Sequence, residues 1–239
     1  MKALFIQLAI QFKGDLRDKG VLMVYYLVPL VFYAVMGSIM KTLSMDTGAS
    51  LTLSITIFAV SMSSFLGMPA TLVKARELGY LEAYRAAGIP AWSLPLTAIV
   101  ISTLHIMIVA VVIMLSAPYI FGVTWPENIA AHLLTVLLAA LCSQSLGALL
   151  ACLVKKQNSM TLAAQCLFLP SIMFSGIMFP ENLLPKPMQW IGEVLPATQG
   201  VRLYSDTGLQ LQPLLILAGI MVVAFAISAI LFRRISQRK

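Results

Sequence analysis

Six long apolar runs constrain this chain more than any other feature of its sequence. An α-helix needs about 20 residues to cross a hydrocarbon core about 30 Å thick, and each run is close to that length. None of them contains Lys, Arg, Asp or Glu, and they cover residues 21–40, 51–73, 94–116, 129–154, 160–179 and 213–232. We therefore predict an all-α polytopic membrane protein in which six transmembrane helices form a single domain over residues 1–239.

The composition supports a membrane location for the whole chain. Hydrophobic residues make up 60% of the 239 and charged residues only 10%, which is far from the balance of a soluble domain. We expect the first run to remain in the mature protein, because it begins only near Val21 and is as long as a full span. The net charge of +7 predicts contact with anionic lipid rather than nucleic acid, since no basic patch with interleaved aromatic residues forms a groove.

The positions of Lys and Arg indicate how the spans are oriented. Six spans place both termini on one side of the membrane, and loops rich in Lys and Arg stay in the cytoplasm. With the N-terminus inside, all but three of the 16 basic residues are cytoplasmic, the three exceptions being Lys41, Lys186 and Arg202. We therefore predict a multi-pass protein of the bacterial cytoplasmic (inner) membrane whose two termini are both cytoplasmic.

Residues 1–19 carry too many charges to span a membrane but are apolar enough to touch one. The residues that share one helical face are Leu4, Phe5, Leu8, Phe12 and Leu16. This pattern predicts an interfacial helix. Because Ile6 and Ile10 fall off that stripe, a plain charged tail is the alternative.

The outer segment 180–212 is too long for a tight connection and too apolar for a disordered one. Proline is tolerated at the start of a helix but not in its interior. Two short helices are therefore expected, one from about Pro187 to Val194 and the other after Thr198, which we predict as its N-cap. The apolar face of the first is expected to dip into the membrane.

The segment 74–93 is the most unusual stretch between two spans. It is about 20 residues long, whereas a few residues suffice to connect two helices. The part from Lys74 to Arg85 holds five charges. We predict a helix stopped by Gly88 and Pro90. A short amphipathic helix with aromatics and both signs of charge is typical of a peptide that docks in a partner's groove. The alternative is a solvated helix that contacts only its own chain.

Two motifs then connect this topology to a known family. Arg76-Glu77-Leu78-Gly79-Tyr80-Leu81-Glu82 follows the second span, and Ser175-Gly176-Ile177-Met178-Phe179-Pro180 ends the fifth. With this placement, the chain resembles the permease subunits of type-2 ABC exporters, a class that includes bacterial exporters of drugs, antimicrobial peptides and lipids. Ala75 and Tyr80 depart from the family pattern, which has an acid and a small hydroxyl residue there.

The resemblance implies a division of labour between subunits. A cytosolic ABC ATPase would bind ATP and Mg²⁺, and this chain, which lacks the motif G-x-x-x-x-G-K-[ST], would bind no cofactor and catalyse no reaction. Two permeases, identical or homologous, would pair and move an amphipathic or hydrophobic compound outward. The segment 74–93 would be the coupling helix, and its coupling residues would be Arg76, Glu77, Gly79, Leu81, Glu82, Tyr84 and Arg85.

Spans 2 and 5 border the central path in that family. The substrate-path candidates are Phe58, Met62, Phe65, Phe168, Ser171, Met173, Phe174 and Ser175; core packing is the alternative for each. In span 4, small residues recur at every fourth position and predict close helix packing; they are Ala139, Ser143, Gly147 and Ala151. We expect Gln144 to bond across that contact, and Pro29, Pro69 and Pro170 to bend their helices.

Two other function classes were weighed. An ion-coupled carrier normally places an ionisable group in its path, and the spans hold only His105 and His132, of which we expect His105 to be a neutral packing residue. A membrane-embedded enzyme needs converging carboxylates, a metal set or a nucleophile, which no spacing here suggests. Cys142, Cys152 and Cys166 lack ligand spacing and are expected in the apolar core.

Overall fold

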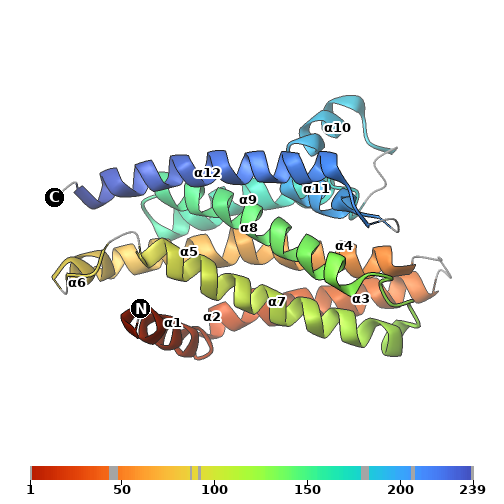
Figure 1. The fold of residues 1–239 in the computed structure, drawn as a ribbon, viewed down its shortest axis with the longest axis horizontal. Helices are drawn as coiled ribbons and strands as arrows, with labels where there is room; N and C mark the ends of the chain where they lie inside the picture. Colours follow the sequence, from red (N-terminus) through yellow and green to blue (C-terminus); the bar gives the residue numbers. More distant parts are fainter. Residues whose placement is uncertain are drawn as a thin grey trace.

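The computed structural model describes residues 2–42, 48–86, 88–90, 93–178, 183–205 and 208–237. Long helices lie roughly along one axis, and both chain ends lie toward the same end of the bundle as helix α6 (Figure 1). In chain order the elements are α1 (Lys2–Asp15), α2 (Lys19–Leu22), π-helical η1 (Met23–Leu27), α3 (Val28–Thr42), α4 (Gly48–Met62), π-helical η2 (Ser63–Gly67), α5 (Met68–Glu77), α6 (Tyr80–Ala86), α7 (Ser93–Phe121), α8 (Ile129–Leu153), α9 (Gln157–Met173), α10 (Lys186–Glu193), α11 (Pro196–Leu203), β1 (Tyr204–Ser205), β2 (Gly208–Leu209) and α12 (Leu211–Gln237).

Five helical stretches in the described ranges are long and apolar enough to cross a membrane. They are Lys19–Ile39, Thr52–Glu77, Ser93–Phe121, Ile129–Leu153 and Leu211–Phe232, which confirms a helical multi-pass fold. The predicted span that is not among these five is the fifth, and it corresponds to α9, whose 17 residues rise about 26 Å at 1.5 Å per residue. Bends replace the helix from Phe174 to Met178, so α9 is shorter than the predicted span 160–179.

Two of the three prolines expected to bend helices follow π-helical turns. Pro29 lies just after η1 and Pro69 just after η2. A proline has no N–H for the helix and its ring clashes with the carbonyl four residues earlier, and a wider turn relieves that clash. Pro170 lies inside α9, which continues to Met173.

Helix α8 lies at the centre of the bundle and contacts α4, α5, α7, α11 and α12. The prediction of close packing along its small-residue stripe is confirmed, because a Cβ atom on Gly147 would overlap the backbone oxygen of Ser64. Gln144 Nε2 donates to Thr103 Oγ1 at 3.2 Å, so it bonds to another helix as expected, but that helix is α7 and not span 2, which Gly147 contacts. Small side chains thus let the α8 backbone approach its neighbours.

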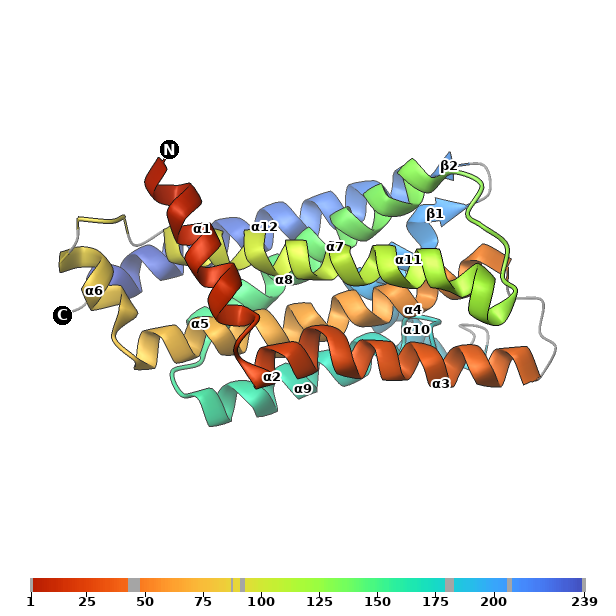
Figure 2. The same cartoon turned by 90° about the horizontal axis from the view of Figure 1, so that it is seen from below.

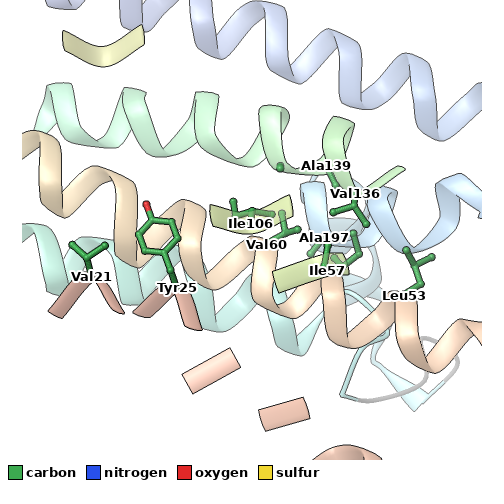
Figure 3. Close-up of a cluster of buried hydrophobic side chains, with 11 residues drawn as sticks. Val21, Tyr25, Leu53, Ile57, Val60, Ile106, Val136, Ala139 and Ala197 are labelled. Atoms are coloured by element: carbon green, nitrogen blue, oxygen red, sulfur yellow. The ribbon is translucent and has the colours of Figure 1, made fainter. Parts of the chain in front are cut away.

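The largest buried apolar cluster joins elements far apart in the sequence. Figure 3 shows Tyr25 near Ile106 and Val60, and Val136 and Ala139 near Ala197. Since Ala197 belongs to α11, this outer helix is built into the bundle rather than laid on it. Its residues 196–200 are all buried.

The outer segment differs in detail from its prediction. Helix α10 lies one residue from its predicted bounds. The prediction that Thr198 caps the next helix is wrong, because α11 begins at Pro196 with Leu195 at the N-cap, and proline favours the first turn. An unpredicted antiparallel hairpin with strands of two residues each follows, pairing Tyr204 with Leu209, within a fold that is otherwise helical as predicted.

The three cysteines do not share one environment. Cys142 is buried and Cys152 partly buried, as expected for core residues, but Cys166 is exposed on α9. The expectation was therefore wrong for Cys166, because the helical face on which a residue lies within α9, and not its apolarity, decides its burial.

Candidate functional site

The charged segment after span 2 is not one helix. Helix α5 continues the span to Glu77, the chain turns at Leu78 and Gly79, and α6 begins at Tyr80. Gly79 has φ of +75°, a left-handed conformation that costs glycine little. The predicted single helix is therefore wrong, and the predicted coupling residues are divided between two helices. The predicted stop holds, since Gly88 with φ of +69° follows α6.

The two coupling candidates on α5 contact their own chain. Arg76 Nη1 donates to the Ala151 carbonyl at 2.6 Å, and Glu77 Oε1 accepts from the Gln157 backbone N–H at 3.1 Å. Ala151 lies in the last turn of α8 and Gln157 begins α9, where helices leave carbonyls and N–H groups without helical partners. The end of α5 therefore fastens the connection between α8 and α9.

The candidates on α6 are placed differently. The candidate Glu82 is exposed, and so are two residues that were not candidates, Leu78 in the turn before α6 and Tyr80 at its start, at 58% and 50%. Leu81 and Arg85 lie in α6, with side chains outside the described part. Large exposed apolar and aromatic side chains next to charges are the composition of a docking surface.

Helix α6 is tied back to the bundle through Tyr84. Its hydroxyl accepts from Gln7 Nε2 at 2.7 Å, and the same amide lies 3.3 Å from Thr97 Oγ1 of α7. Burial raises the pKa of Tyr84, so the hydroxyl is neutral at physiological pH. One amide of α1 therefore joins α6 to the start of α7.

A salt bridge makes a second link between the N-terminal segment and span 2. Lys74 Nζ lies 2.8 Å from Asp18 Oδ2, while the other carboxylate oxygen accepts from the N–H groups of Gly20 and Val21 and caps α2. The hydrogen bond from Lys74 lowers the pKa of the Asp18 carboxyl. The links of Lys74, Arg76, Glu77 and Tyr84 together are called the brace below.

Helix α1 lies across α7 (Figure 2). Phe12 of its predicted apolar stripe stacks on His105, with ring centroids 4.9 Å apart, whereas Ile6 and Ile10 off that stripe are 60% and 67% exposed. At Phe12, therefore, the predicted stripe contacts protein rather than lipid. The face of α1 that carries Ile6 and Ile10 is exposed.

His105 is fully buried, as expected for a packing residue. Its Nδ1 lies 2.6 Å from the Tyr26 hydroxyl, and its Nε2 lies 3.6 Å from Asp15 Oδ2. Asp15 was not predicted as a neighbour, because two whole spans separate the helices on which the two residues lie. No spacing in the sequence signals such a contact.

Three tyrosines of span 1 were also missed. Tyr25 bonds Ser102 and Tyr33 bonds Ser116, each at 2.8 Å, and Tyr26 bonds His105. A hydroxyl inside a membrane needs a partner, so tyrosines in an apolar run were the available signal. They form a polar seam between spans 1 and 3.

The path candidates fall into two groups. Phe58 and Met62 of α4 pack in one buried cluster with Phe168 of α9 packed against it. The ring of Phe58 stacks on Phe32 with centroids 3.6 Å apart and meets Phe168 edge-on at 5.7 Å. The structure thus brings these three candidates together at the junction of spans 1, 2 and 5.

The remaining candidates do not join that cluster. Phe65 is fully buried, whereas Met173 is 44% exposed and Phe174 is half-buried. Ser171 and Ser175 donate to the carbonyls of Leu167 and Ile172 in their own chain segment. Their substrate role stays a prediction.

Similarity to known proteins decides the class of this helical bundle. The family described as "ABC-2 type transporter" matches residues 2–209. The chain belongs to this family. The permease is also similar to "Putative transport permease YvfS" of Bacillus subtilis (strain 168), with 25% identity over 202 residues that cover 82% of each chain. The predictions of a multi-pass membrane protein and a transport permease are thereby confirmed, and such permeases generally work with a cytosolic ATPase.

Proposed function

We propose that this permease is the membrane half of a bacterial ATP-driven exporter. It moves an amphipathic or hydrophobic compound outward across the inner membrane, with both termini in the cytoplasm, and a separate cytosolic ATPase binds ATP and Mg²⁺ and supplies the energy. The observation that carries the proposal is α6. It is a short helix at the end of the bundle where the chain termini lie (Figure 1).

The exposed side of α6 supports its role as the ATPase contact. Leu78 is 58% exposed and Tyr80 is 50% exposed. The exposed Glu82 adds a charge to this surface. Buried aromatic anchors with a charged rim are what give protein interfaces most of their affinity. On this proposal, Gly79 allows α6 to turn out of the line of α5 and present these side chains to a groove.

The brace supports the transmission of force from α6 to the spans. Tyr84 connects α6 to α1 and α7 through Gln7. Arg76 and Glu77 connect the preceding turn to the ends of α8 and α9. A displacement of α6 is thereby passed to four other helices, and this suits a subunit whose energy arrives through a mechanical joint.

The outer surface of α9 supports a second permease chain, identical or homologous. Asn158 and Gln165 are exposed on this helix, and uncompensated side-chain amides are costly in hydrocarbon. A facing protein surface or a water-filled path would satisfy them. In this arrangement α9 and the bends after it complete a sixth crossing, and Phe58, Met62 and Phe168 form an apolar wall near the path.

The test is co-expression of the permease with the ATPase encoded beside its gene. We expect Tyr80→Ala or Glu82→Lys to weaken binding of the ATPase about thirtyfold and so to reduce its co-purification, because truncating an interface anchor costs about 2 kcal/mol. The matched controls are Tyr119→Ala and Glu127→Lys, which change exposed residues outside α6 and are expected to retain the ATPase. Undiminished co-purification by both α6 variants would contradict the docking assignment.

A second variant separates docking from transmission. Arg76→Ala removes the bond to Ala151 without changing α6, so we expect the ATPase to remain bound while transport per ATP hydrolysed falls. Transport in proteoliposomes and ATP hydrolysis are measured on the same preparation. Transport that persists without ATP and is abolished by a protonophore would instead favour an ion-coupled carrier.

A further inference from the structure

A cavity of about 650 Å³ lies between α10 and the bundle, apart from the residues of the brace. Leu146, Leu167 and Ile220 line it from α8, α9 and α12, and Pro187, Trp190 and Ile191 line it from α10. Its volume is in the range of pockets that hold a small organic ligand. Every lining side chain is apolar.

Two polar side chains of α10, those of Gln189 and Glu193, are engaged elsewhere. Gln189 Nε2 donates to the Leu184 carbonyl at 2.8 Å, and Glu193 forms an ion pair with Arg202 at 2.7 Å. A ligand that placed a polar group in the cavity would lose that group's hydrogen bonds to water. The cavity therefore suits hydrocarbon.

The surroundings of the cavity indicate where the hydrocarbon comes from. Three of its walls are helices of the bundle, and on or beside α10 the side chains of Leu183, Trp190 and Val194 are 71%, 71% and 66% exposed. Such exposed apolar side chains, with an indole among them, are typical of contact with the membrane interface. The molecule present there in greatest amount is membrane lipid.

Charge narrows the class of lipid. Lys186 begins α10 directly before Pro187 of the cavity wall, and it is exposed. An ammonium group beside an apolar cavity complements a phosphate attached to a hydrocarbon chain. We propose that this cavity holds one acyl chain of an anionic membrane phospholipid, with its headgroup phosphate near Lys186.

Such a lipid has a mechanical consequence, which rests on the proposed function. Helix α10 is held against the end of α9, because a Cβ atom on Gly192 would lie 2.7 Å from the Phe174 carbonyl oxygen. Phe174 and Ser175 are predicted path residues. An acyl chain between α10 and α9 therefore sets the position of α10 against the outer end of α9, next to these two residues.

The experiment uses the full-length permease in nanodiscs that contain phosphatidylglycerol with a diazirine in one acyl chain. Illumination followed by peptide mass spectrometry is expected to label Leu146, Ile191 or Ile220. Leu167→Trp fills the cavity and is expected to lower this labelling about fivefold, since a filled cavity has no room for a chain. The matched control is Leu162→Trp, at a residue of the same helix that is 67% exposed and does not line the cavity, and it is expected to leave labelling unchanged.

Further arms keep the proposal falsifiable. If Leu167→Trp does not fold, Ile191→Trp fills the same cavity from α10. Lys186→Gln is expected to lower labelling by phosphatidylglycerol but not by phosphatidylcholine carrying the same chain. Cavity labelling no stronger than that of Leu162, or labelling insensitive to filling, would overturn the proposal. So would efficient disulfide cross-linking of two copies through Val194→Cys in a cysteine-free background, because a second chain would then occupy the site. None of these readouts needs the ATPase, so they can fail while export is intact.

Discussion

Span 2 and the last span of this permease are used in opposite ways. In Thr52–Glu77, 83% of the most apolar window is buried inside the bundle, whereas in Leu211–Phe232 the share is 17%, although the last span is the more apolar of the two. Lipid tails are as apolar as leucine, so hydrophobicity does not draw one span against another. Of these two spans, the more apolar one lies at the periphery, and the one rich in small and hydroxyl residues is buried inside the bundle.

The physical basis is visible along span 2. Ser63, Ser64 and Gly67 are buried at η2, where the backbone approaches its neighbours: a Cβ atom on Gly67 would lie 2.7 Å from the ring of Tyr25. Thr56 Oγ1 donates to the Thr52 carbonyl at 2.7 Å, so its hydroxyl costs little when buried. Close packing and internal hydrogen bonds, rather than apolar area, hold the centre together.

The largest expected effect comes from adding a methyl group at the centre. Gly147→Ala forces apart α8 and Ser64 of span 2, and we expect a loss of about 2 to 3 kcal/mol, as in overpacked cores. The control is Gly219→Ala on α12, where no atom lies within 4 Å of the added Cβ. Thermal unfolding in one detergent compares them. Equal unfolding midpoints for the two variants would contradict the conclusion that span 2 is closely packed and the last span is not.

An aromatic pair of variants tests the same contrast with a smaller effect. Phe58→Ala removes a buried ring that stacks on Phe32, and we expect a loss of about 1 to 2 kcal/mol from the aromatic contact, because lipid is as apolar as the bundle interior and the transfer term of a soluble core is absent. Phe225→Ala removes a ring of α12 that is 51% exposed and should change stability by less than about 0.5 kcal/mol. Unfolding midpoints again provide the measurement, and a larger effect at Phe225 would mean that a protein surface covers α12.

The hydroxyl groups give a third and smaller contrast. Tyr26→Phe removes a bond to His105 on another span and should cost about 0.6 kcal/mol, the average for bonds between membrane helices. Ser228→Ala on α12 removes a hydroxyl that donates to Phe225 of its own helix and should be neutral. A neutral Tyr26→Phe would show that the polar seam between spans 1 and 3 adds no stability.

The smallest effect is expected at the exposed end of span 2. Asp18→Asn breaks the salt bridge to Lys74. The Asp18 side chain is 37% exposed and that of Lys74 is 46% exposed, so we expect a loss of stability of about 0.5 kcal/mol or less. The pKa of Asp18 is lowered in the folded protein. Its contribution is therefore present above the unfolded pKa of about 3.9 and is lost as the pH falls through the folded value. Wild type and variant should thus differ at pH 7 and converge once the pH falls below the lowered pKa of Asp18 in the folded protein, and a difference that stays constant as the pH is lowered would exclude the salt bridge as its cause.

Much of the helical architecture was predictable because each span is specified locally. Charge-free runs of about 20 residues predicted five of the observed membrane helices, and α9 proved shorter than its run. The stripe on α8 predicted a close contact, which Gly147 makes, since small residues on one helical face have few other uses. The turn at Gly79 between α5 and α6 was not predicted, because the same residue types occur on both sides of it and one glycine with positive φ makes the turn.

The candidate site was predictable in location but not in its internal contacts. The charged segment is placed as an exposed helix beyond span 2, yet Arg76 and Glu77 face the chain's own α8 and α9. Local sequence shows that a residue is charged but does not show which helix end it will meet. The neighbours of His105 were missed for the same reason.

The sequence by itself determined that this chain crosses a membrane several times and carries a charged connection after its second span, because both follow from runs of apolar and charged residues along one helix. Only the tertiary structure decided which span is central, which residues form the brace, and where a cavity remains beside α10. Those outcomes depend on the facing of helices that are distant in sequence. Every span in a membrane is apolar, so the hydrophobic effect does not decide which helical faces pack against each other. Small residues, hydrogen bonds of hydroxyl groups and contacts at helix ends decide it instead.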